Sequence, residues 1–176
     1  MNIDKTPAKR VFEEMAEIFS RELQKNIRLT EIDEVALNAW EQDWKPINQR
    51  EPPNGGWNWK DFQANNDKKF KTRYFNMAIW EREQLCGLSL GHISRDSTHV
   101  WIDLIEGSPF ESHPLKGYIL KIIIVTSTEY ARVMKRKFLK LAEPVSGLIE
   151  KYTQQYGFEY VNRGFFKKRP ICQKEV

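Results

Sequence analysis

Long apolar runs, signal-peptide features and clustered cysteines are all missing from this sequence of 176 residues. No window approaches the roughly 20 consecutive apolar residues that a membrane-spanning helix needs, so we expect no membrane span. The first residues, MNIDKTPAKRVFEEM, lack the apolar core and the small-residue cleavage site of a signal peptide. Cys86 and Cys172 lie far apart and match no metal-binding or redox spacing. We therefore expect a reduced, cytoplasmic protein without a bound metal.

A strong charge bias is also absent. The chain has 28 Lys and Arg against 24 Asp and Glu, which gives a net charge of +4. Such a mild excess attracts anionic partners, including nucleic acid or a phosphorylated cofactor. The two basic runs, KRK at 135–137 and KKR at 167–169, are typical of a solvated surface, so nucleic-acid binding is the weaker interpretation.

Hydrophobic residues are plentiful, at 40%, and aromatic residues reach 12% with six tryptophans. This composition predicts a folded domain with a real core rather than a disordered chain. Apolar spacing then predicts the elements. The expected helices are 6–26, 34–44, 61–70, 118–137 and 146–157, and the expected strands are 27–33, 74–80, 85–93, 98–106, 138–144 and two within 158–171.

Three neighbouring stretches, 74–80, 85–93 and 98–106, are joined by the short polar turns EREQ and SRDS, which predicts an antiparallel meander. Residues 118–124 alone suit a buried strand, but helical spacing continues to Met134 and favours a helix. Thr6, Ser146 and Gly157 are the expected helix caps. The order of elements predicts a mixed α+β fold, an α/β sandwich with an antiparallel central sheet.

Several stretches carry a family resemblance. LIEKYTQQYGFEYV (148–161) places a tyrosine-bearing helix before Gly-Phe and a strand, and WEREQLCGLSLG (80–91) turns over a polar tip into a glycine-containing strand. With the element order, they resemble the GNAT superfamily of N-acetyltransferases over roughly residues 27–166. The resemblance implies a GNAT-like acyltransferase domain at 27–176, preceded by an added N-terminal amphipathic helix at 1–26.

The resemblance also implies an acetyl-CoA site in the stretch EGSPFESHPLKGYILKIII (106–124). In the family, a loop of pattern Q/R-x-x-G-x-G/A holds the pyrophosphate at a helix N-terminus, where free N–H groups favour anions. Gly117 matches the first glycine, while Pro114 and Ile119 occupy the other two defined positions and depart from the pattern. The implied cofactor-binding residues are His113, Lys116, Gly117, Tyr118 and Ile119. A simple turn with a solvated Lys116 is the alternative.

Acetyl transfer to an amine needs a base for the amine proton and an acid for the leaving thiolate. The family often uses a central-strand carboxylate and the late-helix tyrosine, which implies Glu106 or Asp103 as base and Tyr152 as acid. Period-2 alternation along 98–106 places Asp103 beside Trp101 on the cleft or solvent face and Glu106 with Val100, Ile102 and Leu104 on the core face, at the strand end. Thr153 occupies the family's tyrosine position, so Tyr152 is displaced by one residue.

The acceptor would be an amine, either a small molecule or a protein terminus. The turn-rich loop at 48–62 brings Trp57 and Trp59 together, and with Trp80 they are the expected substrate-binding aromatics. Core packing is the alternative for these tryptophans, while Cys86 is expected to be a buried small hydrophobe. A catalytically silent GNAT-like binding module remains an alternative to the enzyme, and a homodimer is left open.

Overall fold

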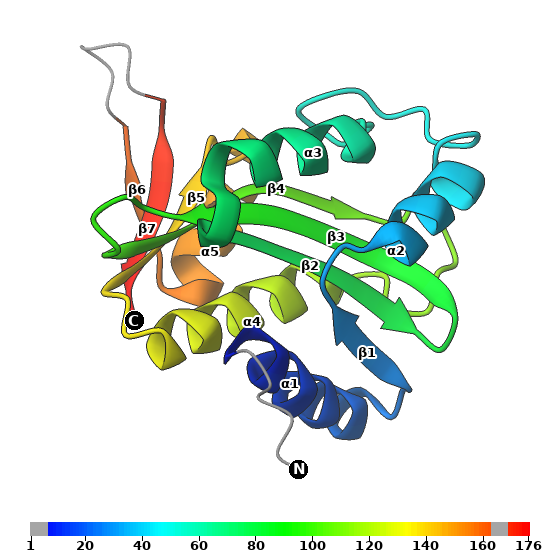
Figure 1. The fold of residues 1–176 in the computed structure, drawn as a ribbon, viewed down its shortest axis with the longest axis horizontal. Helices are drawn as coiled ribbons and strands as arrows, with labels where there is room; N and C mark the ends of the chain where they lie inside the picture. Colours follow the sequence, from blue (N-terminus) through cyan, green and yellow to red (C-terminus); the bar gives the residue numbers. More distant parts are fainter. Residues whose placement is uncertain (1–6, 163–168) are drawn as a thin grey trace.

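The computed structural model describes residues 7–162 and 169–176 (Figure 1). A seven-stranded sheet has the order β1-β2-β3-β4-β5-β7-β6. Every neighbouring pair is antiparallel except β4 and β5, which run parallel. The strands are β1 (Ile27–Thr30), β2 (Tyr74–Glu81), β3 (Gln84–Ile93), β4 (His99–Gly107), β5 (Phe138–Ala142), β6 (Glu159–Val161) and β7 (Ile171–Glu175).

Helices cover both faces of this sheet (Figure 1). They are α1 (Pro7–Leu23), α2 (Glu34–Ala39), α3 (Trp59–Phe70), α4 (Ile119–Val133) and α5 (Ile149–Tyr156). A π-helical turn, Trp40–Trp44, extends α2, and 3₁₀ turns follow α3 at Lys71–Arg73 and precede α5 at Ser146–Leu148. None of the helices in the described part of the chain combines the length and apolarity that crossing a membrane requires.

Two hydrophobic clusters lie on opposite faces of the sheet. The larger cluster joins α1, α4 and α5 to one face, and the smaller joins α2, the π-helical turn and α3 to the other. The N-terminal helix is part of the larger core, to which it contributes Val11, Phe12, Met15 and Phe19. The sequence-predicted α+β sandwich with an antiparallel meander is therefore confirmed, and the ambiguous stretch 118–137 is a helix.

Some predicted boundaries are wrong for local reasons. Helix α3 begins at Trp59 because the Asn58 side chain accepts a hydrogen bond from Asp61 N and caps it. Ser146 caps nothing with its side chain, because the chain first makes a 3₁₀ turn there. Gly157 does end α5, with φ +69° and its N–H donated to Tyr152 O. The last strand begins only at Ile171.

Other predictions lie outside the described residues. They are the Thr6 cap, most of the turn at 162–164 and two of the three residues of the run 167–169.

A β-bulge in β4 overturns the predicted alternation. Leu90 pairs with Leu104 and Gly91 pairs with Ile102, which leaves Asp103 as an extra residue without a partner. Ile102 belongs to the α4-side core, whereas Leu104 packs with the α3-side cluster. Glycine is required at position 91, because a Cβ there would lie 1.9 Å from Trp101 O. Residues 104 and 106 consequently face the opposite side of the sheet from residues 100 and 102.

Candidate functional site

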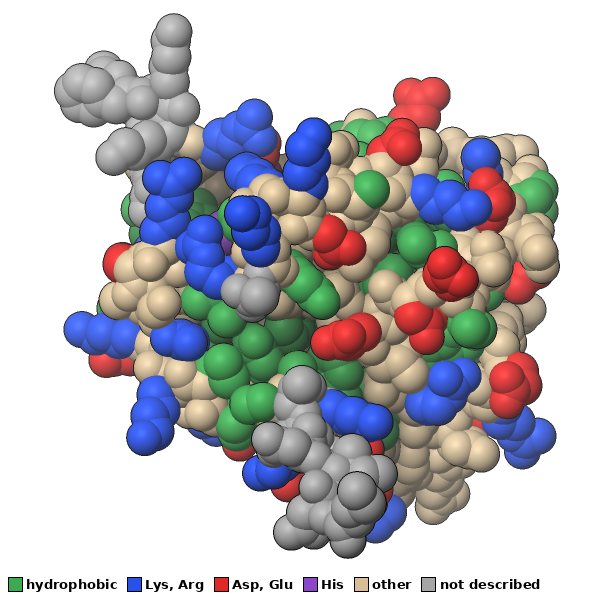
Figure 2. All heavy atoms as spheres, in the orientation of Figure 1, with side chains coloured by type: hydrophobic (Ala, Val, Ile, Leu, Met, Phe, Trp, Pro, Cys, Tyr) green, Lys and Arg blue, Asp and Glu red, His purple; other side chains and the backbone are tan. Residues whose placement is uncertain are grey.

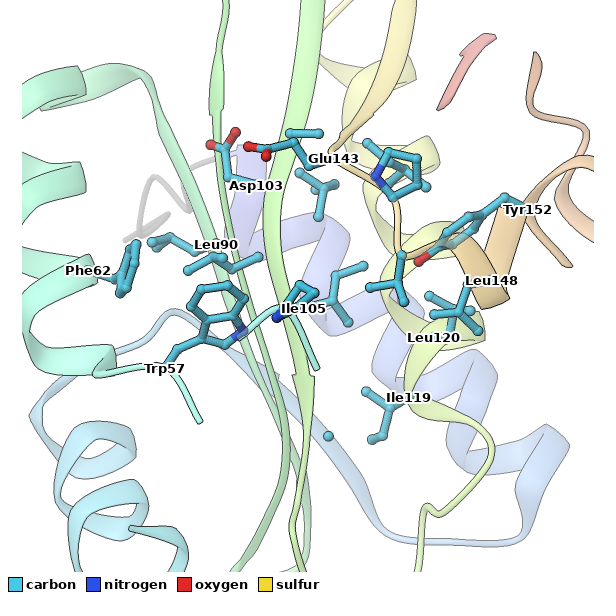
Figure 3. Close-up of a pocket in the computed structure, with 18 of the residues that line it drawn as sticks. Trp57, Phe62, Leu90, Asp103, Ile105, Ile119, Leu120, Glu143, Leu148 and Tyr152 are labelled. Carbon is cyan, nitrogen blue, oxygen red and sulfur yellow. The ribbon is translucent and has the colours of Figure 1, made fainter. Parts of the chain in front are cut away.

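The parallel strands β4 and β5 separate at the bulge. Their pairing runs from His99↔Phe138 to Ile102↔Leu141 and stops there. Beyond that point β4 continues to Gly107, while β5 ends at Ala142. A cavity of 920 Å³ lies beside the diverging ends and is bordered by both strands, by α3 and by α4 and α5 (Figure 3).

The cavity reaches both faces of the sheet. Trp57, Phe62 and Leu90 line it on the α3 side, and Figure 3 places them on one side of β4. Leu120 and Tyr152 line it on the α4 and α5 side, across the strand. Two ligands could therefore approach each other from opposite faces through the gap between β4 and β5.

The N-terminus of α4 borders the α4 side of the cavity. Gly117 and Ile119 line the cavity, while Lys116 and Tyr118 are exposed and do not. Gly117 has φ +86°, a conformation that favours glycine, and the space around its missing Cβ is open. Tyr118, the N-cap residue, makes no capping hydrogen bond with its side chain. Its first-turn N–H groups are therefore available to an anion.

His113 lies beneath this helix start. It lines the cavity and is buried, with 7% of its surface exposed. Its Nδ1 has no hydrogen-bond partner among the described residues. Burial, followed by the nearby charges of Lys116 and Arg50, lowers the pKa of the imidazole. A neutral imidazole with a buried, unpartnered ring nitrogen therefore lies in the cavity wall.

Asp103, the extra residue of the bulge, faces the cavity as predicted. Its Oδ2 lies 2.6 Å from His92 Nδ1, and His92 lines the same cavity. The His92 ring is held by stacking on Phe70, with ring centroids 4.0 Å apart and planes 6° apart, and it lies parallel to Trp101. No sequence pattern pointed to His92. His92 lies opposite Trp101 in the β3–β4 hairpin, so the predicted pairing of these two strands was the signal that could have placed His92 near Asp103.

Glu106 occupies a different environment. It is buried and its carboxylate accepts hydrogen bonds from four groups. Oε1 accepts from Asn48 Nδ2 at 2.8 Å, Arg50 Nη2 at 3.1 Å and Gly56 N at 2.8 Å. Oε2 accepts from Trp59 Nε1 at 2.6 Å. Glu106 lines neither described cavity, so its position fits an anchor for the loop before α3 rather than the predicted base.

The predicted aromatic binding wall is only partly present. Trp57 is half-buried and lines the cavity, where it meets Phe62 edge-on at 5.6 Å. Trp59 and Trp80 are core residues, and their predicted role in substrate binding is wrong. The Trp59 indole donates to Glu106, and the Trp80 indole donates to Thr30 Oγ1 at 3.1 Å. Both rings are needed to hold the fold and present no free face to a ligand.

Tyr152 lines the cavity from α5, and Figure 3 shows its ring directed toward the space beside the end of β5. Burial, with smaller contributions from Cys172 and Tyr156, raises the pKa of its phenol to about 12. The phenol is therefore protonated at neutral pH and can donate a hydrogen bond, and the raised pKa makes it a weaker acid than a solvated tyrosine. Tyr156, four residues later on α5, packs against the larger core.

Cys86 is fully buried, and burial raises the pKa of its thiol to about 11. This environment is consistent with the expected small hydrophobe. Within residues 7–162 and 169–176, no three His, Cys, Asp or Glu side chains are grouped so that they could hold a metal ion.

Solved structures match the chain closely in fold but not in sequence. No protein-family model and no curated protein matches it. The ribosomal-protein-S18-alanine N-acetyltransferase from Escherichia coli matches with a TM-score of 0.56 at 18% identity, covering 85% of this chain and 94% of that one. The PaiA N-acetyltransferase from Thermoplasma acidophilum, solved with coenzyme A, matches with a TM-score of 0.58 at 11% identity, covering 85% and 99%.

A GNAT-family acetyltransferase structure from Desulfovibrio desulfuricans matches with a TM-score of 0.57 at 10% identity, covering 85% of this chain and 98% of that one. The first two of these structures are N-acetyltransferases, and the third is an acetyltransferase of the GNAT family. The chain therefore has the GNAT fold, as the sequence resemblance predicted.

Proposed function

We propose that the protein is an acetyl-CoA-dependent N-acetyltransferase that acts on a primary amine by direct transfer in a ternary complex. One observation carries the proposal. A single cavity joins an uncapped helix N-terminus on one face of the sheet to a histidine–aspartate pair at the parting of β4 and β5. The likeness in fold to N-acetyltransferases, one of them holding coenzyme A, supports the assignment.

The residues at the start of α4 fit the diphosphate of acetyl-CoA. The open space at Gly117 and the first-turn N–H groups offer an anion a close approach to the backbone. The unpartnered Nδ1 of His113 adds a polar atom that needs a ligand or water. Ile119 and Leu120 offer apolar contact beside it, and the exposed Lys116 and Tyr118 remain proposed contacts at the rim. When bound, acetyl-CoA supplies a thioester that an amine can attack, with the CoA thiolate as leaving group.

Asp103 and His92 would handle the proton of the amine. An ionised carboxylate can only accept, so the contact at 2.6 Å assigns the Nδ1 hydrogen to His92 and leaves Nε2 as the basic nitrogen. Asp103 also places a negative charge at the cavity wall, where an ammonium group would be attracted. The amine would lose its proton to this pair as its nitrogen forms the new bond to the acetyl carbon.

Tyr152 would act on the leaving group, at the thioester C–S bond that breaks when the new N–C bond forms. Its phenol is protonated at neutral pH and would donate a hydrogen bond to the departing sulfur; because the raised pKa makes it a weaker acid, the proton would move only as negative charge develops on that sulfur. Trp57 and Phe62, on the α3 side, would contact the acceptor. The two proton carriers then come from different faces of the sheet, as transfer between two separately bound ligands requires.

Calorimetric titration with acetyl-CoA tests the proposal. We expect saturable binding to the wild type and much weaker binding to Gly117→Trp, because the indole would fill the space at the helix start. Gly157→Trp is the matched control, since position 157 has a similar left-handed φ of +69° but does not line the cavity. Release of CoA thiol with a panel of amines then measures transfer. Absence of acetyl-CoA binding to the wild type would remove the proposal.

A binding module that has lost catalysis is the second candidate. The departure of Pro114 and Ile119 from the family's loop pattern favours it. Acetyl-CoA binding without CoA release across the amine panel would support this candidate over the enzyme.

A further inference from the structure

A second pocket adjoins the cavity on the side of the acceptor. It has a volume of 700 Å³ and lies at the ends of α3, β3 and β5. The two spaces are neighbours because they share seven lining residues, namely Lys69, Phe70, His92, Asp103, Ala142, Glu143 and Arg169. A ligand with its amine at Asp103 could extend directly into this second space.

The wall of the second pocket is strongly basic. Lys69 comes from the last turn of α3, Arg73 from the following 3₁₀ turn, Arg95 from the β3–β4 turn and Arg169 from the start of the segment that leads into β7. These segments are far apart in sequence, so the fold gathers the four cations around one hollow. Figure 2 shows Lys and Arg side chains gathered at the left of the drawn face, on the side where α3 ends in Figure 1.

The two carboxylates in this pocket neutralise only part of its basic charge. Glu143 forms an ion pair with Arg169, and Asp103 is paired with His92. Lys69 lies over the Phe70 ring, 4.9 Å from its centroid. Arg73 and Arg95 have no carboxylate partner among the described residues. Guanidinium groups gathered without counter-charges repel each other, and an oxyanion that takes two parallel hydrogen bonds relieves that repulsion.

The positions of the charges define a substrate with two ends. Asp103 and Glu143 line both spaces together with Lys69 and Arg169, whereas Arg73 and Arg95 line only the second pocket. A substrate that carried only positive charge, such as a polyamine, would be attracted at the junction but repelled beyond it. A substrate with an amine at one end and an anionic group at the other matches both charges.

We propose that the acceptor is a primary amine that also carries a phosphate or carboxylate group, which binds between Arg73, Arg95 and Lys69 in the second pocket. This inference rests on the proposed acetyl-transfer function and specifies its substrate class. The aromatic wall of Phe70, His92 and Trp101 lies between the two charged ends and would contact the connecting part of the substrate.

Calorimetric binding of matched probe pairs tests the inference without needing turnover. The phosphate arm compares O-phosphoethanolamine with ethanolamine, and the carboxylate arm compares β-alanine with propylamine. We expect at least one probe with an anionic group to bind the wild type about tenfold or more tightly than its match without that group, the gain of one charge-assisted hydrogen bond. The arm with the larger preference identifies the anionic group.

Two double variants separate the pocket from general charge. Arg73→Gln/Arg95→Gln removes two cations that line the pocket, and Lys68→Gln/Lys71→Gln removes two neighbouring cations that do not. We expect the first variant to bind the anionic probe about tenfold more weakly and the second to stay within about twofold. Circular dichroism checks both folds. If the first does not fold, Lys69→Gln against Lys68→Gln gives the same comparison.

The outcomes are distinct from those of the proposed function. Equal binding of both members of each pair by the wild type, no binding of either, or a preference that persists in the pocket variant overturns the inference. Failure of the proposed function is read separately, in the titration with acetyl-CoA. Binding of acetyl-CoA together with a preference for the probes without an anionic group, or for putrescine, would keep the proposed function and remove the anionic acceptor.

Discussion

The substitution Glu106→Gln tests whether this buried carboxylate anchors a loop or acts as a base. Gln keeps the size of the side chain but replaces one accepting oxygen with a donating NH₂ group. The remaining oxygen can face the three donors from Asn48, Arg50 and Gly56, and the NH₂ group then faces the Trp59 indole N–H. The opposite orientation loses three hydrogen bonds, so the first is preferred.

The cost follows from these contacts. A charge-assisted hydrogen bond to Trp59 is lost and a buried donor is left unpaired, which together cost roughly 3 to 5 kcal/mol. The ion pair with Arg50 adds little, on the order of 1 kcal/mol or less, because the arginine side chain is 34% exposed and screened by solvent. A loss of this size lowers Tm by roughly 6 °C or more in a domain of this length.

Urea unfolding followed by tryptophan fluorescence measures the change, since six tryptophans report on the fold. Glu111→Gln is the matched control, because Glu111 is exposed on the following loop, and we expect a change within about 0.5 kcal/mol there. An equally small change for Glu106→Gln would refute the anchoring role. If acetylation were lost at the same time, Glu106 would instead be the base.

Four further outcomes are expected. Asp103→Asn should lower kcat about 100-fold or more with little change in stability, measured by CoA release, and an unchanged kcat would exclude it from proton transfer. Tyr152→Phe should lower kcat about tenfold or more and leave acetyl-CoA binding intact by calorimetry. Gly91→Ala should destabilise by about 3 kcal/mol or more in urea, because the new Cβ would lie 1.9 Å from Trp101 O. Because its folded pKa is lowered, His113 excludes a proton that the unfolded chain binds below about pH 6.5, so stability should fall between pH 7 and 5 and fall less in His113→Gln.

Local patterns account for most of the fold. Apolar spacing separated α4 from a strand, because the repeat continued beyond the β-branched residues 122–125 for several turns. Polar turns identified the β2–β3–β4 meander, because each turn is encoded by a few adjacent residues. The bulge at Asp103 has no such signal. Residues 100, 102, 104 and 106 alternate without a break, and the insertion depends on Gly91 in the neighbouring strand.

The candidate site was predicted less completely, because its contacts join distant segments. Asp103 was placed on the cleft face, but its partner His92 lies eleven residues away across a hairpin. Glu106 was expected to be accessible at a strand end, yet Asn48 and Arg50 reach it from a loop more than fifty residues earlier. Gly117 and Tyr152 were predicted from the family resemblance. The resemblance implied the order of the helices and strands, and this order places both residues at one cavity.

The two edges of the sheet have a consequence for behaviour at high concentration. In the described part of the chain, the outermost strands are the shortest, with four residues in β1 and three in β6, whereas the inner strands have five to ten. Exposed edges are where one sheet can pair with another and begin aggregation, and short edges leave few unpaired backbone groups for it. Strand β3 is paired on both edges, with β2 and β4, whereas β2 is paired with β1 only from Ala78 to Glu81. The strand order thus places the longest strand, β3, in the interior of the sheet and leaves only short strands at its two edges.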